Sequence, residues 1–174
     1  MAINEELITI ENADIFWENF TGREKQFNAA GERNFCVAIG SDDAERLKED
    51  GWNVKIKEAR NPDDEVKNFI KVKIKYNEMY PKLNPNIYLI VNGRKNLLNE
   101  DTVSQLDHVD IQTVDVTIRA YHHEPMNGYP STITAYVKDM YVVASMDALA
   151  SKYAKYDNIS DNADFDELDE DVPF

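Results

Sequence analysis

Apolar and polar side chains alternate most regularly between residues 67 and 76. One alternate set is apolar and the other is basic: Ile70, Val72, Ile74 and Tyr76 against Lys71, Lys73 and Lys75. Because successive side chains of a β-strand point to opposite faces, this spacing predicts a strand with one buried face and one cationic face. It is the clearest secondary-structure prediction in the chain.

Similar stretches rich in β-branched and aromatic residues predict the other strands. We expect a bent or broken first strand at residues 7–20, and further strands at 33–39, 52–57, 86–91, 109–122 and 131–144. Residues typical of helix starts predict short helices at 41–51, 99–107 and 145–156. Glycine, asparagine and proline predict loops or turns at 20–31, 61–64, 80–86, 92–93 and 125–130.

Many strands with a short helix after the middle ones, in a chain of 174 residues, predict a mainly β protein built around a small barrel. The OB-fold is a five-stranded barrel of this type, with a helix usually between strands 3 and 4, and residues 99–107 take that place. Periodicity alone does not prove that a barrel closes, so a β-sandwich is the alternative. We expect the folded domain to span residues 1–156.

The net charge of −14 is unevenly distributed along the chain. Residues 157–174 contain eight acids and no Lys or Arg, which leaves 25 of the 33 acids and all 19 bases in residues 1–156, a net charge of −6. A segment this polar buries too little apolar surface to offset its ordering entropy, so we expect residues 157–174 to form a disordered acidic tail. The asymmetry indicates a tail with a role of its own.

The end of this tail has features that solubility alone does not require. Pro173 restricts the backbone next to the terminal Phe174, which lowers the entropy lost on docking. An apolar pocket with a basic rim on a partner protein would accept the ring and pair with the carboxylates. The alternative is a tail that only aids solubility. The predicted partner-binding residues are Asp169, Glu170, Asp171, Val172, Pro173 and Phe174.

The ending DELDEDVPF, at residues 166–174, resembles the C-terminal tail of bacterial single-stranded DNA-binding proteins. The body is similar instead to a phage-encoded OB-fold family that binds single-stranded DNA, over residues 8–145. That similarity lies in the segments ADIFWENF (13–20), RNFCV (33–37), GWNVK (51–55) and TIRAY (117–121). The two resemblances imply a sequence-independent single-stranded DNA-binding protein of phage DNA replication, recombination or repair, whose tail recruits replication and recombination proteins.

Binding a single strand without reading its sequence requires cations for the phosphates and exposed rings for the bases. The lysine stripe suits this task, since its members stand about 7 Å apart, close to the spacing of successive phosphates. The predicted phosphate contacts are Arg23, Lys25, Arg33, Lys71, Lys73, Lys75 and Arg119. The predicted stacking rings are Trp17, Phe20, Phe27, Tyr80 and Tyr121. The alternatives are a solvated outer face for the lysines and a minor hydrophobic cluster for the loop rings.

Catalysis, a metal site and a cofactor are not expected. His122 and His123 point to opposite faces of a strand, and Cys36 is the only cysteine, so neither type supplies a metal cluster. The sequence has no glycine-rich phosphate loop. It also lacks a signal-peptide pattern and an apolar run long enough to span a membrane, so we expect a cytoplasmic protein, in the host cell if it is phage-encoded.

Two other functions fit parts of the sequence. An acidic DNA mimic or inhibitor would need its acids spread over a folded face, whereas here the excess lies in residues 157–174. A structural phage β-sandwich protein has no need for a terminal Pro-Phe. A homodimer also fits the sequence, with either the helix at 145–156 or an edge strand as its contact.

Removal of residues 157–174 is expected to strengthen DNA binding at low salt. Acids on a flexible tether reach an effective concentration of about 1 mM at a basic groove, where they compete with DNA. Oligothymidine titrations of the full-length and truncated chains measure the difference, which should shrink as salt is added. Equal affinities at low salt would discard this competition.

Overall fold

The computed structural model describes residues 2–3 and 6–145. The predicted acidic tail and the predicted partner-binding residues lie outside the described residues, as does the helix expected at 145–156, apart from Ser145, which ends a strand. The proposed domain boundary at residue 156 lies outside them as well.

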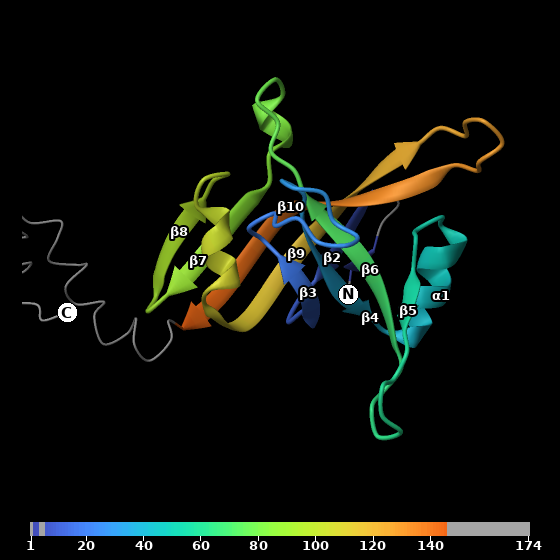
Figure 1. Cartoon of the computed structure of the whole chain (residues 1–174), viewed down its shortest axis with the longest axis horizontal. Helices are drawn as coiled ribbons and strands as arrows, with labels where there is room; N and C mark the ends of the chain where they lie inside the picture. Colours follow the sequence, from blue (N-terminus) through green and yellow to red (C-terminus); the bar gives the residue numbers. More distant parts are fainter. Residues whose placement is uncertain (1, 4–5, 146–174) are drawn as a thin grey trace, which may run out of the picture.

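The prediction of a mainly β protein is confirmed, with ten strands, one α-helix and two short 3-10 helices in the described residues (Figure 1). In chain order they are β1 (Ala2–Ile3), β2 (Leu7–Ile10), β3 (Ile15–Asn19), β4 (Arg33–Ile39), α1 (Ser41–Glu49), β5 (Lys55–Lys57), β6 (Lys67–Ile74), η1 (Pro81–Leu83), β7 (Asn86–Val91), β8 (Arg94–Leu98), η2 (Val103–Asp107), β9 (Asp110–His123) and β10 (Thr132–Ser145). The number of strands exceeds the five of a minimal barrel.

The strands form one mixed sheet in the order β1-β2-β9-β10-β6-β4-β3. Strand β10 pairs in parallel with two neighbours: with β6 at Ala135 and Tyr136, and with β7 from Asp139 to Val143. A register shift between Val137 and Asp139 separates the two stretches. As a result the β7–β8 hairpin lies at one end of the sheet, and α1 with β5 lies at the other (Figure 1).

Strands β2 and β3 are the two halves of the bent first strand that the sequence predicts. The break is at residues 11–14, where Asn12 has a positive φ of 50°. The first half pairs with β9 and the second with β4, so the two halves lie near opposite ends of the hydrogen-bonded strand order. The connection is held on both sides, by Ala13 N donating to Val114 O and by Ala38 N donating to Asp14 O.

Strand β6 has one buried apolar face and one basic face, as its alternation predicts. Ile70, Val72 and Ile74 are buried in the core, and Lys71 and Lys73 on the opposite face are only partly covered. Tyr76, beyond the end of the strand, is half-buried, and burial of its hydroxyl raises its pKa to about 12. Most of the core comes from inward positions of β2, β4, β6, β9 and β10, with Ala44 and Leu47 of α1 completing it.

Strand β8 was not predicted, because Arg-Lys-Asn-Leu-Leu lacks a strand-like pattern of its own. Pairing with β7 creates it: the two strands face each other from Ile87 with Leu98 to Val91 with Arg94. Asn92 and Gly93 join them with positive φ values of 52° and 77°. Two successive positive φ values are the requirement of a tight type I′ hairpin turn.

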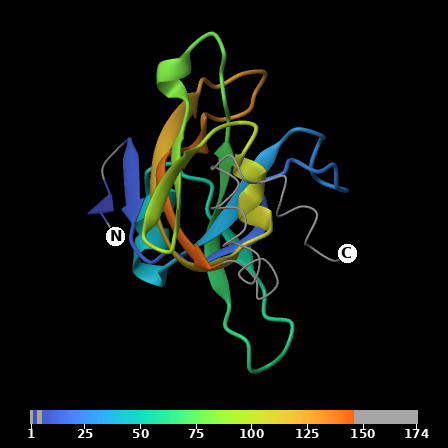
Figure 2. The ribbon, with the colours of Figure 1, turned by 90° about the vertical axis from the view of Figure 1, so that its left-hand side faces the viewer.

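The loop between β3 and β4, residues 20–32, projects to one side of the sheet (Figure 2). Its first residue corrects a prediction: Phe20 is completely buried, with its ring centroid 5.8 Å from that of Phe35. The backbone N–H of Phe20 donates to Asp107 Oδ1, which fixes the start of the loop against η2. A ring in the core cannot stack on DNA bases, so Phe20 stabilises the fold instead.

The two loop phenylalanines should differ sharply in their effect on stability. Phe20→Ala leaves a cavity in the core and is expected to lower the free energy of unfolding by about 3–5 kcal/mol. Phe27→Ala removes a ring that is 86% exposed and should change it by less than about 0.5 kcal/mol. Urea denaturation of both variants measures the difference; similar values for the two would contradict the burial of Phe20.

Candidate nucleic-acid interface

The outer face of the central strands is continuous across the sheet. Directly opposed residues of a sheet share a face, and one row runs across four strands as Asn34 on β4, Lys73 on β6, Tyr136 on β10 and Arg119 on β9. The adjacent rows place Lys71 opposite Cys36 and Tyr121 opposite Thr134. We call this surface the channel face.

One end of the channel face contains a cavity of about 410 Å³ beneath the 20–32 loop, here named the loop-side cavity. It is lined by Trp17, Lys25, Gln26, Phe27, Asn28, Asn34, Cys36, Lys55, Phe69 and Lys71. The lining combines three aromatic rings with three lysines and contains no carboxylate. Its floor comes from β4 and β6, and its wall comes from the loop.

The other end of the channel face contains a second cavity of about 440 Å³, here named the hairpin-side cavity. It is lined by Lys75, Asn77, Tyr80, Leu83, Arg119, Tyr121, His123, Tyr136 and Val137. Again rings and cations are mixed and the lining includes no carboxylate. Tyr121 packs edge-on against His123 and Tyr136, so the rings form one cluster. Lys73 lies on β6 between the two cavities.

Trp17 reaches the loop-side cavity through an irregularity in β3. The register with β4 shifts between Phe16 and Asn19, and Trp17 has a positive φ of 53°. Its ring is 52% exposed and makes edge-to-face contacts with Phe16 and Phe69. The ammonium of Lys57 lies 5.2 Å from its ring centroid. Trp17 is therefore an exposed ring supported from behind, as a base-stacking platform requires.

The structure brings most of the predicted DNA-binding residues to the channel face. Trp17, Lys25, Phe27 and Lys71 line the loop-side cavity, and Lys75, Tyr80, Arg119 and Tyr121 line the hairpin-side cavity. Arg119 also donates a hydrogen bond to Leu83 O. Phe20, Arg23 and Arg33 do not belong to either lining.

Arg33 is tied down by contacts within the protein. Its Nε donates to Phe20 O at 3.1 Å, and its terminal nitrogens reach Glu100 O at 3.2 Å and Glu100 Oε1 at 3.9 Å. The side chain is 18% exposed. The guanidinium joins the 20–32 loop to the segment before η2, so the structure does not bring this predicted phosphate contact into either cavity of the channel face.

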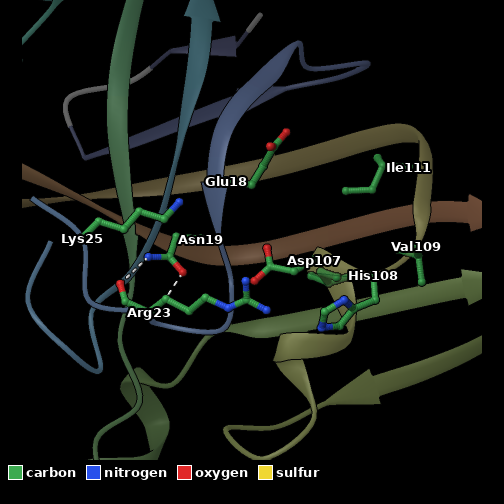
Figure 3. Close-up of a pocket in the computed structure, with 9 residues that line it drawn as sticks. Glu18, Asn19, Arg23, Lys25, Asp107, His108, Val109 and Ile111 are labelled. Carbon is green, nitrogen blue, oxygen red and sulfur yellow. Dashed lines mark hydrogen bonds between the residues drawn. The ribbon is translucent and has the colours of Figure 1, made fainter.

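Arg23 faces a third cavity, of about 540 Å³, on the other side of the loop (Figure 3). Glu18 and Asp107 line this cavity with Arg23, Lys25 and His108, so its charges are mixed. Asp107 is also engaged, since its carboxylate accepts three hydrogen bonds from Phe20 N, Thr21 N and Thr21 Oγ1. Carboxylates beside the cations make this cavity a poor site for phosphate, although it is the largest of the three.

Four lining residues with a ring or a basic group were not among the predicted contacts: Lys55, Phe69, His123 and Tyr136. A signal was present for Phe69, which falls in the same alternate positions as the lysines of β6. Lys55 is opposite Phe69 in the β5–β6 ladder, and Tyr136 is opposite Arg119 in the β9–β10 ladder. These positions follow only from strand register, which one sequence does not reveal.

Within residues 2–3 and 6–145, no group of three or more His, Cys, Asp or Glu side chains is arranged to hold a metal ion. In the same residues, no helix combines the length and apolar character needed to cross a membrane.

Comparison with known families decides the assignment. A family described as "Putative phage ssDNA-binding domain" matches residues 1–173. The chain belongs to this family. Membership confirms the phage resemblance of the body, and it favours the DNA-binding prediction over the acidic mimic and the structural phage protein.

Solved structures that match the chain include the single-stranded DNA-binding protein from bacteriophage Enc34. Its C-terminal truncation has a TM-score of 0.48 and 12% identity, with 81% of this chain and 86% of that chain covered. The same protein in complex with ssDNA has a TM-score of 0.46 and 9% identity, with 84% of this chain and 93% of that chain covered. No curated protein matches the sequence.

Cys36 provides a test of the loop-side cavity. Burial raises the pKa of its thiol, and the charges of Lys71 and Lys55 oppose this rise only in part. Alkylation by iodoacetamide near pH 8 should therefore be much slower than in the urea-denatured chain. Saturating oligothymidine should slow it further, because the strand would cover the cavity floor. An alkylation rate unchanged by oligothymidine would contradict DNA binding over Cys36.

Proposed function

We propose that this protein binds single-stranded DNA without sequence preference along the channel face. The observation that carries the proposal is the composition of the two cavities on that face, where aromatic rings alternate with lysine and arginine and no carboxylate intervenes. Such a surface meets the two requirements of strand binding: cations for phosphates and ring faces for bases.

The charges of β6 suit a strand that runs along the channel face. Lys71, Lys73 and Lys75 follow one another at about 7 Å, the repeat of two residues in a strand. Trp17 and Phe27 at one end, and Tyr80 and Tyr121 at the other, offer their faces to bases. Every base has a π-face, so stacking tolerates all sequences. This explains binding that does not depend on sequence.

We infer an OB-type architecture for the barrel. The order β2/β3, β4, β6, η2, β9 and β10 supplies five principal strand positions, with the short helix before the last two. OB-folds are partly open five-stranded barrels that bind oligonucleotides on the face of strands 2 and 3 and with the loop between strands 1 and 2. Here those parts are β4, β6 and residues 20–32, which form the loop-side cavity.

The cellular role that follows is the coating of strands exposed during phage DNA replication, recombination or repair. We propose that the acidic ending at residues 169–174 recruits proteins of these processes, on the strength of its sequence. Binding of this kind needs no cofactor and no chemical step. We also propose a cytoplasmic location and a homodimer.

Salt dependence tests the phosphate contacts. Each lysine that pairs with a phosphate should contribute about 0.7 to the slope of log affinity against log salt for single strands. Lys71→Ala, Lys73→Ala and Lys75→Ala are each expected to reduce the slope by up to about that amount, measured by anisotropy of a labelled oligothymidine. Lys48→Ala on α1 is the control. Slopes equal to that of the unchanged chain in all three variants would refute the assignment.

A further inference from the structure

The 20–32 loop has an unusual internal support. Within the described residues, the buried polar or charged residues are three asparagines, Asn19, Asn28 and Asn34, at the two ends and within this one loop. A buried amide is unfavourable unless its hydrogen bonds are made. All three side chains make theirs to the loop or to one another.

Asn28 is the centre of this network. Its Nδ2 lies 2.9–3.1 Å from the carbonyl oxygens of Arg23, Ala29 and Glu32, so one carboxamide ties together both sides of the loop. Its backbone N–H and C=O form two further hydrogen bonds with Lys25. The residues enclosed by these last bonds are Gln26 and Phe27, which form the tip.

Asn34 connects the network to the channel face. It belongs to β4, opposite Lys73 of β6, and its Nδ2 donates to Asn28 Oδ1 at 2.6 Å. Asn19 fixes the other end, where its Oδ1 accepts hydrogen bonds from Gly22 N and Arg23 N. The loop is therefore bonded to the floor over which a DNA strand would lie.

The exposed tip shows what this support holds in place. Phe27 is 86% exposed and has no part in the core, yet the backbone on either side of it is fixed. Lys25 and Phe27 both line the loop-side cavity. A ring and a cation held in position before binding lose little conformational entropy when a strand arrives, which raises affinity without any new contact.

We propose that Asn28 and Asn34 are positioning residues for DNA, which keep the loop tip pre-organised over the channel face. This inference rests on the proposed function, because it assigns Phe27 a stacked base. The competing explanation is that the asparagines serve only the stability of the fold. If the asparagines position the loop tip, the contribution of Phe27 to DNA affinity depends on them. If they serve only stability, it does not.

A double-mutant cycle separates the two explanations. Oligothymidine affinity is measured for Phe27→Ala in the unchanged chain and in Asn28→Ala. The matched control repeats the cycle with Tyr121→Ala, which removes a ring of the hairpin-side cavity, whose lining contains none of the three asparagines. Thermal unfolding of each variant shows that it is folded. Asn34→Ala, which removes a single bond to Asn28, is the second background if Asn28→Ala does not fold.

In the unchanged chain, Phe27→Ala and Tyr121→Ala should each weaken binding about ten-fold, as loss of a stacked base does. In the Asn28→Ala or Asn34→Ala background, Phe27→Ala should weaken it less than about two-fold, while Tyr121→Ala keeps its full effect. Equal losses for Phe27→Ala in both backgrounds would overturn the proposal. If neither ring matters in the unchanged chain, the DNA site itself is misplaced and the proposed function fails.

Discussion

The two-residue period of β6 is the constraint from which both the core and the channel face follow. This strand pairs with β4, β5 and β10, so its inward side chains lie in the middle of the core. Each buried Ile70, Val72 or Ile74 obliges the next residue to face outward, and that residue is a lysine. A one-residue slip would bury three ammonium groups, which is prohibitive. The register that stabilises the fold therefore also fixes the spacing of the cations.

The sequence predicts those parts of the molecule that depend on local alternation. The strand with its lysine stripe, the two long strands around the 125–130 loop, the helix from Ser41 and the bent first strand are found where expected. Of the predicted contacts, eight line the two cavities and Lys73 lies between them. For these residues, except Trp17 with its irregular strand, the strand face or the neighbouring loop was enough to place the side chain.

Two predicted contacts, Phe20 and Arg33, lie outside both cavities because of partners far away in the sequence. Phe20 is buried because Phe35 and the backbone bond to Asp107 draw the loop start inward. Arg33 is occupied because Glu100 lies beside it, 67 residues further along the chain. Local composition does not indicate either of these long-range contacts, and both involve the 20–32 loop or its flanking residue. Phe27, by contrast, stays exposed because the bonds of Asn28 hold the backbone around it and leave its ring outside.

Trp17 has an unfavourable backbone conformation at the channel face. A positive φ in a bulky residue is unfavourable, by about 1–3 kcal/mol, and persists only where its surroundings hold it. Here the register shift in β3 and the edges of Phe16 and Phe69 do so. A regular strand would direct neighbouring rings to opposite faces. The irregularity instead sets Trp17 beside Phe69 at the mouth of the loop-side cavity.

The short parallel pairing of β6 with β10 gives the channel face a finite length. Beyond Val137 the strand β10 turns to β7, and the floor made with β6 ends. From Phe69 to Lys75 that floor extends about 20 Å, at roughly 3.3 Å per residue. A floor of this length accommodates on the order of four nucleotides, which is the smallest site size known for one OB-fold. On the proposed function, covering a long single strand would require many copies in a row, so the amount of protein in the cell would determine how much strand stays covered.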